Sequence, residues 1–165
     1  NKRRQNARKS AGPREETTLR ILIDADGCPV VEETLACASR HGVEVLLVSD
    51  DAHVWDRVRA QVVTVTRGAD SADYALVNRT QPGDLVVTQD YGLAAMCLAR
   101  RAKVLHPNGF RYHEGNMDAL LMARHTARKI RSAGGRLKGP KKRSAAQDAA
   151  FTQALEALLR EGTSN

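Results

Sequence analysis

Short apolar segments that alternate with helical segments are the feature that most limits what this chain can fold into. The segments 19–24 (LRILID), 43–49 (VEVLLVS) and 84–89 (DLVVTQ) are apolar along most of their length, rather than at every second position. A strand carries apolar residues on both sides when helices cover both faces of its sheet. The pattern therefore predicts an α/β protein with three layers (αβα) around a mainly parallel central sheet.

Helical periodicity and end signals place the helices between these strands. Pro29 suits the first turn of a helix and Gly42 suits its end, which predicts a helix over 30–41. Asn116 is the expected N-cap of a longer helix over 117–131. The full prediction comprises strands at 19–24, 43–49, 61–66, 84–89 and 103–105, and helices at 30–41, 54–60, 70–79, 93–101, 117–131 and 145–160.

The length of 165 residues favours one domain with a sizeable core. Residues 1–17 are polar and aperiodic, which predicts a flexible basic extension, and we expect the domain over 18–161 with a short tail at 162–165. No apolar run approaches the roughly 18–20 residues that a membrane span needs, and none near the N-terminus resembles a secretion signal. The three cysteines form neither a zinc pattern nor a disulfide framework, which favours a reducing cytoplasm.

Charge is distributed unevenly along the chain. The net charge is +7, yet residues 124–143 hold nine Lys or Arg and no acid, whereas residues 17–123 are net negative. A basic segment beside an acidic body suits a protein that binds nucleic acid. The phosphates would contact the basic segment, and a metal ion would bind at the acidic body. The residues expected to bind phosphates are Arg124, Arg128, Arg131, Arg136, Lys138, Lys141 and Lys142.

Carboxylates follow three of the predicted strands. Asp24 and Asp26 end the first strand, Asp90 ends the fourth, and Asp70 and Asp73 follow the third within one helical turn. Because parallel strands end at one edge of their sheet, we expect these five side chains to lie together. Such a cluster is electrostatically costly unless a cation lies within it, and carboxylate oxygens suit Mg²⁺ or Mn²⁺. Zinc is disfavoured because the sequence offers no Cys and His cluster.

Other polar residues near the strand ends suit structural roles. Asp84 follows Pro-Gly at the opposite end of a strand and is interpreted as turn chemistry, and loop solvation is favoured for Asp50 and Asp51. Cys28 is expected to pack as a small residue rather than act as a nucleophile. Tyr91 suits either stacking on a base or ordinary packing.

Four motifs resemble, in order and spacing, those of the bacterial YaiI/YqxD family: ILIDADGCPV, RGADSADYALVN, PGDLVVTQDYGLA and GGRLKGPK. The resemblance covers about residues 19–160. That family is similar to the PIN-like nucleases, whose acidic residues bind Mg²⁺ or Mn²⁺ at the carboxyl end of a parallel sheet. The resemblance implies a PIN-like domain in which Asp24 and Asp26 match the first acidic motif, Asp70 and Asp73 the middle one, and Asp90 the late one.

Three functions are compatible with these observations. The leading hypothesis is a metal-dependent nuclease, with RNA favoured over DNA as substrate, in which Asp24, Asp70 and Asp90 bind metal that activates water. Asp26 and Asp73 would be further or supporting ligands. One alternative is a non-catalytic module that binds nucleic acid or protein through the same fold. The other is a haloacid-dehalogenase-like phosphatase, since DADG resembles the opening DxDG of that superfamily, whose first Asp is a nucleophile.

Overall fold

The computed structural model describes residues 19–50, 55, 58–66, 71–136 and 142–163. The strands of this part are β1 (Arg20–Asp24), β2 (Glu44–Ser49), β3 (Gln61–Thr64), β4 (Leu85–Val87), β5 (Lys103–Leu105) and β6 (Arg111–Tyr112). The helices are α1 (Val31–His41), α2 (Ser71–Arg79), α3 (Tyr91–Ala99), α4 (Glu114–Ser132) and α5 (Ala145–Thr163). The strands form one sheet in the order β3-β2-β1-β4-β5-β6, in which β6 alone is antiparallel to its neighbour.

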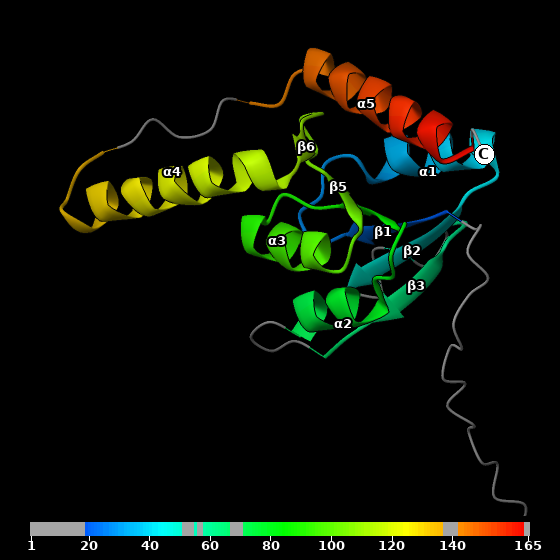
Figure 1. The fold of residues 1–165 in the computed structure, drawn as a ribbon, viewed down its shortest axis with the longest axis horizontal. Helices are drawn as coiled ribbons and strands as arrows, with labels where there is room; N and C mark the ends of the chain where they lie inside the picture. The colour runs from blue at the N-terminus through cyan, green and yellow to red at the C-terminus, as the bar shows by residue number, and fades with distance from the viewer. Residues whose placement is uncertain (1–18, 51–54, 56–57, 67–70, 137–141, 164–165) are drawn as a thin grey trace, which may run out of the picture.

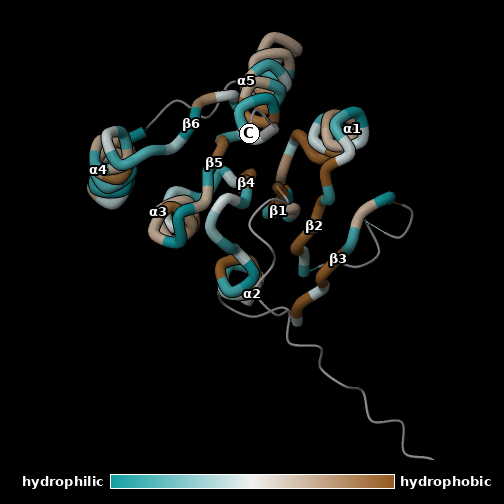
Figure 2. Tube along the Cα trace, turned by 45° about the vertical axis from the view of Figure 1, so that its right-hand side comes forward, coloured by the Kyte–Doolittle hydropathy of each residue, from teal (hydrophilic) through white to brown (hydrophobic). Residues whose placement is uncertain are grey.

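Helices cover both faces of this sheet, with α1 and α5 on one face and α2 and α3 on the other (Figures 1 and 2). Successive residues of β1 point to opposite layers: Ile21 and Ile23 pack in the cluster that contains α1 and α5, and Leu22 packs against the other layer. All three side chains are fully buried. The predicted three-layer fold with a mainly parallel sheet is thereby confirmed, and double-sided burial explains why the strands are apolar throughout.

The helix α5 closes the layer that begins with α1. Phe151 and Leu155 are four residues apart, lie on the same stripe of the helix and are fully buried in the cluster that contains β1. Just before the helix, Arg143 donates from Nε to Asp148 Oδ1 at 2.6 Å, and its two terminal nitrogens donate to residues 107–108. These contacts determine where the chain returns to the core after the basic segment.

The helix α4 departs from the layered core. It begins beside α3 and extends beyond the edge of the sheet at which the parallel strands end (Figure 1). Met117 is its buried residue and Leu120 is partly buried, whereas Met122 and Ile130 are exposed. We call this helix the α4 arm. Among the described helices, none is long and apolar enough to cross a membrane.

The structure differs from the sequence prediction in the presence of one strand and in the extent of one helix. The strand β6 was not predicted, because two residues are too few to show a period of two. The helix predicted over 54–60 is wrong for residues 58–60, which are not helical, whereas Trp55 lies in a 3-10 helical turn. Residues 54, 56 and 57 lie outside the described part.

Two helix starts also differ, because polar side chains act from positions that the sequence did not indicate. Asn116 is not the N-cap of the α4 arm: its Oδ1 accepts a hydrogen bond from the His113 backbone N–H at 3.0 Å, from within the first turn. The helix therefore begins at Glu114. The helix α3 begins two residues earlier than predicted, because Asp90 Oδ1 caps it by accepting from Leu93 N–H at 3.1 Å.

A buried ion pair joins β1 to the turn before β4, at the edge where the parallel strands begin. Arg20 Nη2 lies 3.0 Å from Asp84 Oδ2, and the two residues are 7% and 4% exposed. Asp84 Oδ2 also accepts from Gln81 N–H at 2.8 Å, and Arg20 Nη2 donates to the Arg79 carbonyl. Asp84 thus serves the turn, as interpreted from the sequence, and also holds two strands in register.

We expect Asp84→Asn to lower the free energy of unfolding by about 3–5 kcal/mol, because it leaves the Arg20 charge buried without a partner. Urea unfolding measures this loss. The matched control is Glu161→Gln, whose ion pair with Lys103 lies at the surface with Glu161 55% exposed, and which should cost less than about 1 kcal/mol. Equal losses in the two variants would contradict the role given to the buried pair.

Candidate metal site and nucleic-acid interface

A buried threonine links the carboxylate of one predicted site residue to the backbone of another. Thr88, which follows β4 directly, donates from Oγ1 to Asp24 Oδ2 at 2.9 Å. The same Oγ1 accepts a hydrogen bond from the Asp90 backbone N–H at 3.0 Å. Because Thr88 is 1% exposed, these bonds hold the end of β1 and the start of α3 in a constant relation.

Asp26 is held by the end of the neighbouring strand β2. Its Oδ1 accepts from Ser49 Oγ at 2.6 Å, and its Oδ2 accepts from the Asp50 backbone N–H at 2.9 Å. Ser49 Oγ itself accepts from Trp55 Nε1 at 3.1 Å. Both oxygens of Asp26 are therefore engaged, which suits a carboxylate that is held in one orientation.

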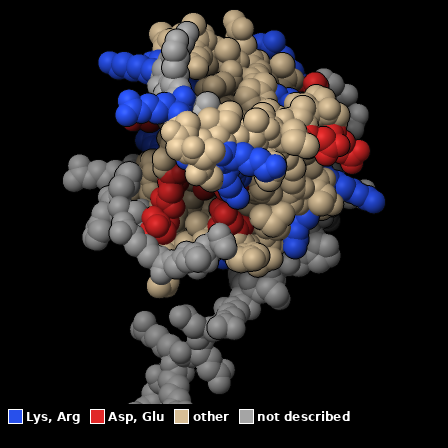
Figure 3. All heavy atoms as spheres, turned by 90° about the vertical axis from the view of Figure 1, so that its left-hand side faces the viewer, with Lys and Arg blue, Asp and Glu red and all other residues tan. Residues whose placement is uncertain are grey.

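Three of the predicted carboxylates line one open cleft of about 480 Å³ at this edge. Figure 3 faces the edge and shows acidic side chains in a hollow with basic side chains beside it. The cleft brings together Asp24, Asp26, Gln89, Asp90, Tyr91 and Arg124. Arg124 belongs to the α4 arm, so the arm supplies a positive charge to an otherwise acidic site.

Asp24 is the carboxylate most affected by its surroundings. Its pKa is raised from 3.8 to about 6, first because burial disfavours the charged form and then because the charges of Asp73, Asp90 and Asp26 repel it. The hydrogen bond from Thr88 acts in the opposite direction. Asp73 thus lies within electrostatic reach of the group, and a divalent cation would offset the repulsion among the four carboxylates.

The donor atoms suit a hard cation, with water completing its shell. One oxygen each of Asp24 and Asp90 accepts a hydrogen bond, and no hydrogen bond from the described residues reaches the second oxygen of either carboxylate. Among the described residues, these carboxylates do not place three ligand atoms within 4.8 Å of one another. Mg²⁺ commonly keeps several waters and takes only one or two carboxylates, so such an open arrangement fits it.

The remaining predicted residues lie on the α4 arm, beyond its C-terminal end, or outside the described residues. Asp70, Lys138 and Lys141 lie outside the described residues. Arg136 and Lys142 are exposed beyond the arm. On the arm itself, Arg128 and Arg131 are exposed and follow Arg124 at helical spacing, so the three form one basic row that leads away from the cleft.

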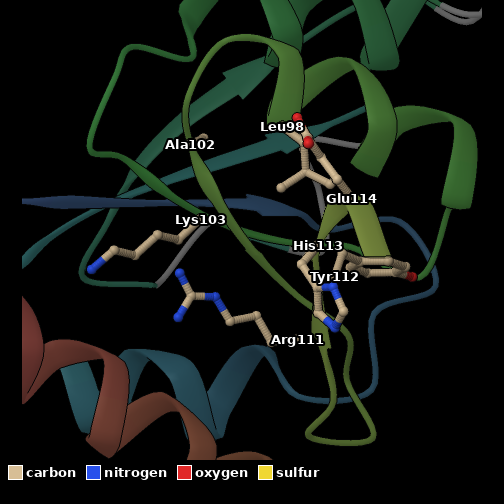
Figure 4. Close-up of a pocket in the computed structure, with 7 residues that line it drawn as sticks. All are labelled: Leu98, Ala102, Lys103, Arg111, Tyr112, His113 and Glu114. Carbon is tan, nitrogen blue, oxygen red and sulfur yellow. The ribbon is translucent and has the colours of Figure 1, made fainter. Parts of the chain in front are cut away.

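A second hollow, shown in Figure 4, is formed by another part of the surface and contains no carboxylate of the cleft. Its two cations, Lys103 and Arg111, lie 3.5 and 3.6 Å from Glu161 Oε2. The hydroxyl of Tyr112 is buried without a partner in the described structure and points away from these cations (Figure 4). Glu114 is the one carboxylate among its described lining residues, so this hollow brings together no cluster of carboxylates for a metal ion.

Two of the three cysteines have different surroundings. Cys28 has an unreactive, partly buried thiol, whereas Cys37 belongs to a group of side chains of metal-binding types that was not predicted from the sequence. Burial raises the pKa of Cys28 to about 11, so its thiol is protonated at neutral pH, in keeping with packing rather than nucleophilic chemistry. Cys37, His41 and Glu156 place one ligand atom each within 4.8 Å of one another. The spacing of Cys37 and His41 on a helix was the available signal, but Glu156 comes from far along the chain.

Comparison with known proteins gives relatives along nearly the whole chain. The sequence profile of the uncharacterized YaiI/YqxD family matches residues 22–161. A UPF0178 protein of Exiguobacterium sibiricum is 50% identical over 145 residues, covering 88% of this chain and 99% of that protein. A UPF0178 protein of Ruminiclostridium cellulolyticum is 46% identical over 137 residues, covering 83% and 90%. No solved structure matches, so the likeness to PIN-like domains stays a prediction.

The pKa of Asp24 predicts how the stability of the metal-free protein depends on pH. A carboxyl group with a raised pKa in the folded state opposes folding when it ionises, so this destabilisation grows from pH 3.8 and is complete above about pH 6. Asp24→Asn removes the charge and keeps an oxygen for Thr88. In chelator-treated protein we expect it to raise the free energy of unfolding at pH 8, by at most about 3 kcal/mol, and by much less at pH 4.

Chemical unfolding at the two pH values measures this difference. Asp118→Asn is the control, because Asp118 is exposed on the α4 arm and should change stability little at either pH. An equal gain for Asp24→Asn at pH 8 and pH 4 would show that its charge is not the cause.

Proposed function

Since the chain belongs to the YaiI/YqxD family, which carries no assigned activity, we propose from the site itself that the protein is a nuclease that hydrolyses phosphodiester bonds in RNA with Mg²⁺ or Mn²⁺. The observation that carries the proposal is a cleft that joins Asp24 and Asp90 to Arg124. Metal-dependent phosphodiester hydrolysis uses a negative site for the metal and a positive group for the phosphate, and this cleft contains both kinds of group.

The protein's own residues would position the reaction. When bound by Asp24 and Asp90, a divalent ion would polarise a phosphoryl oxygen and lower the pKa of bound water. Thr88 holds the Asp24 carboxylate and the Asp90 backbone in a constant relation through its hydroxyl group. Asp26, with both oxygens engaged, supplies negative charge close to the site without changing its own orientation.

The basic row of the α4 arm would bind the nucleic acid from the cleft outward, on one side of the reacting phosphate. Arg124, Arg128 and Arg131 extend over about 10 Å along the helix axis, given a rise of about 1.5 Å per residue. Tyr91 lines the same cleft and offers an aromatic ring for a base of a single strand. These features favour single-stranded RNA held across the acidic edge by its phosphates.

Removing one carboxylate of the cleft should abolish most of the cleavage of single-stranded RNA. We expect Asp24→Asn and Asp90→Asn each to lower the rate at least about 100-fold in Mn²⁺, because each removes a charge that would hold the ion. Asn at position 90 can still cap α3, so the helix should remain intact. Cleavage of a labelled RNA measures the rates, and Asp118→Asn on the exposed part of the arm serves as the matched control.

The alternatives predict other results in the same assay. Unaltered cleavage in both variants, or after removal of metal, would contradict the proposal. Salt-dependent RNA binding without turnover under any metal would favour the non-catalytic module. A phosphoaspartate trapped at Asp24 with a phosphate mimic would favour the phosphatase.

The contribution of the α4 arm can be measured from the salt dependence of RNA binding. We expect Arg124→Ala to weaken binding and to reduce the slope of log K against log salt concentration by about 1, which is the contribution of one phosphate contact. Lys103→Ala is the matched control, because it removes a positive charge that faces Glu161 in the other hollow. If both substitutions change the slope equally, net charge rather than the arm determines binding.

A further inference from the structure

The junction of α1 and α5 brings together three side chains of the kinds that bind zinc. Cys37 and His41 are four residues apart in α1, so both lie on the same side of that helix, next to α5. Glu156 projects from α5 and meets them from the opposite side. Gly42 ends α1 with a left-handed backbone conformation, which leaves His41 in the last turn at the edge of the core.

The three ligand atoms lie close enough together for one metal ion to bind all of them. Cys37 Sγ lies 3.3 Å from Glu156 Oε1, and His41 Nε2 contacts the other carboxylate oxygen. A sulfur, a nitrogen and an oxygen within 4.8 Å of one another need little movement to become zinc ligands. In a tetrahedral site with bonds of about 2.0–2.3 Å, neighbouring ligand atoms are separated by about 3.3–3.6 Å.

The surroundings provide both a charged ligand and a path of entry. Glu156 is held in its charged form, with a pKa lowered to about 2, first by the hydrogen bond from Arg40 and then by those from His41 and Cys37. Cys37 is fully buried, but the side chains of His41 and Glu156 are 23% and 19% exposed, which opens the group to solvent on one side. Arg40 is 56% exposed and can stay on one carboxylate oxygen while the other binds metal.

We propose that Cys37, His41 and Glu156 form a zinc site that fastens the C-terminal helix α5 to α1. One Zn²⁺ takes Cys37 Sγ, His41 Nε2 and one oxygen of Glu156, and water fills the fourth position. Binding converts the Cys37 thiol into a thiolate and releases its proton to solvent, and the His41 proton moves from Nε2 to Nδ1 so that Nε2 can bind the metal. Because the thiol has a pKa raised to about 11 by burial and by Glu156, the proton stays on sulfur until metal displaces it.

This site is separate from the acidic cleft in position and in chemistry. The helix α1 begins near the edge where β1 ends and runs back across the sheet, so its last turn lies at the opposite edge (Figure 1). The cleft presents oxygen ligands alone, which suit Mg²⁺ or Mn²⁺, whereas a thiolate and an imidazole select zinc. The zinc site does not rest on the proposed nuclease activity.

Cobalt substitution tests the site in the full chain. Co²⁺ added to chelator-treated protein should give a thiolate-to-metal charge-transfer band and the visible absorption of tetrahedral cobalt, saturating at one ion per chain. Zn²⁺ should abolish these bands, release about one proton per ion in weakly buffered solution, and raise the melting temperature by several degrees. Cys37→Ser should lose the charge-transfer band and the thermal shift.

Matched variants assign the band to this group of residues. Cys28→Ser should keep it, because Cys28 lies beside the acidic cleft and not at the helix junction. If Cys37→Ser does not fold, His41→Gln at the partly exposed end of α1 serves instead, with cobalt affinity reduced at least about 10-fold. No charge-transfer band in the unmodified protein, or a band that persists in Cys37→Ser or disappears in Asp24→Asn, would overturn the proposal.

Discussion

Parallel pairing of strands that are buried on both faces is the constraint on which the rest of this molecule depends. Each connection between the parallel strands β1 to β5 must return the chain to the edge where the strands begin. All five strands therefore end at the opposite edge of the sheet. The residues that follow β1 and β4 are therefore brought together by topology before any side chain forms a contact. Thr88 then converts this proximity into a defined arrangement of Asp24 and Asp90.

The carboxylates at that edge repel one another, and the basic α4 arm brings a positive charge close to them. The raised pKa of Asp24 reflects the cost of holding a buried carboxylate near three others. The α4 arm adds little to the core, since Met117 is its buried residue, yet it places Arg124 at the cleft. A helix with few buried side chains and a row of arginines is suited to contact a polyanion rather than to stabilise the fold.

The two proposed metal sites differ in the way that the fold assembles them. The cleft collects oxygen ligands from loops that follow strands, where the ends of the sheet lie open to solvent. The junction of α1 and α5 collects sulfur, nitrogen and oxygen ligands from two packed helices. The first arrangement leaves room for water and substrate, and the second holds together segments that are distant in sequence.

What the sequence by itself determined is the class of fold and the meeting of Asp24, Asp26 and Asp90. Continuous apolar runs and the residues that follow them are local signals, and a parallel sheet has one possible edge for its strand ends. Only the tertiary structure decided that Ser49 holds Asp26, that Arg124 reaches the cleft, and that Glu156 lies against Cys37. These contacts join residues that are far apart in the chain, and they depend on how strands pair and how helices pack over the sheet, which no local pattern records.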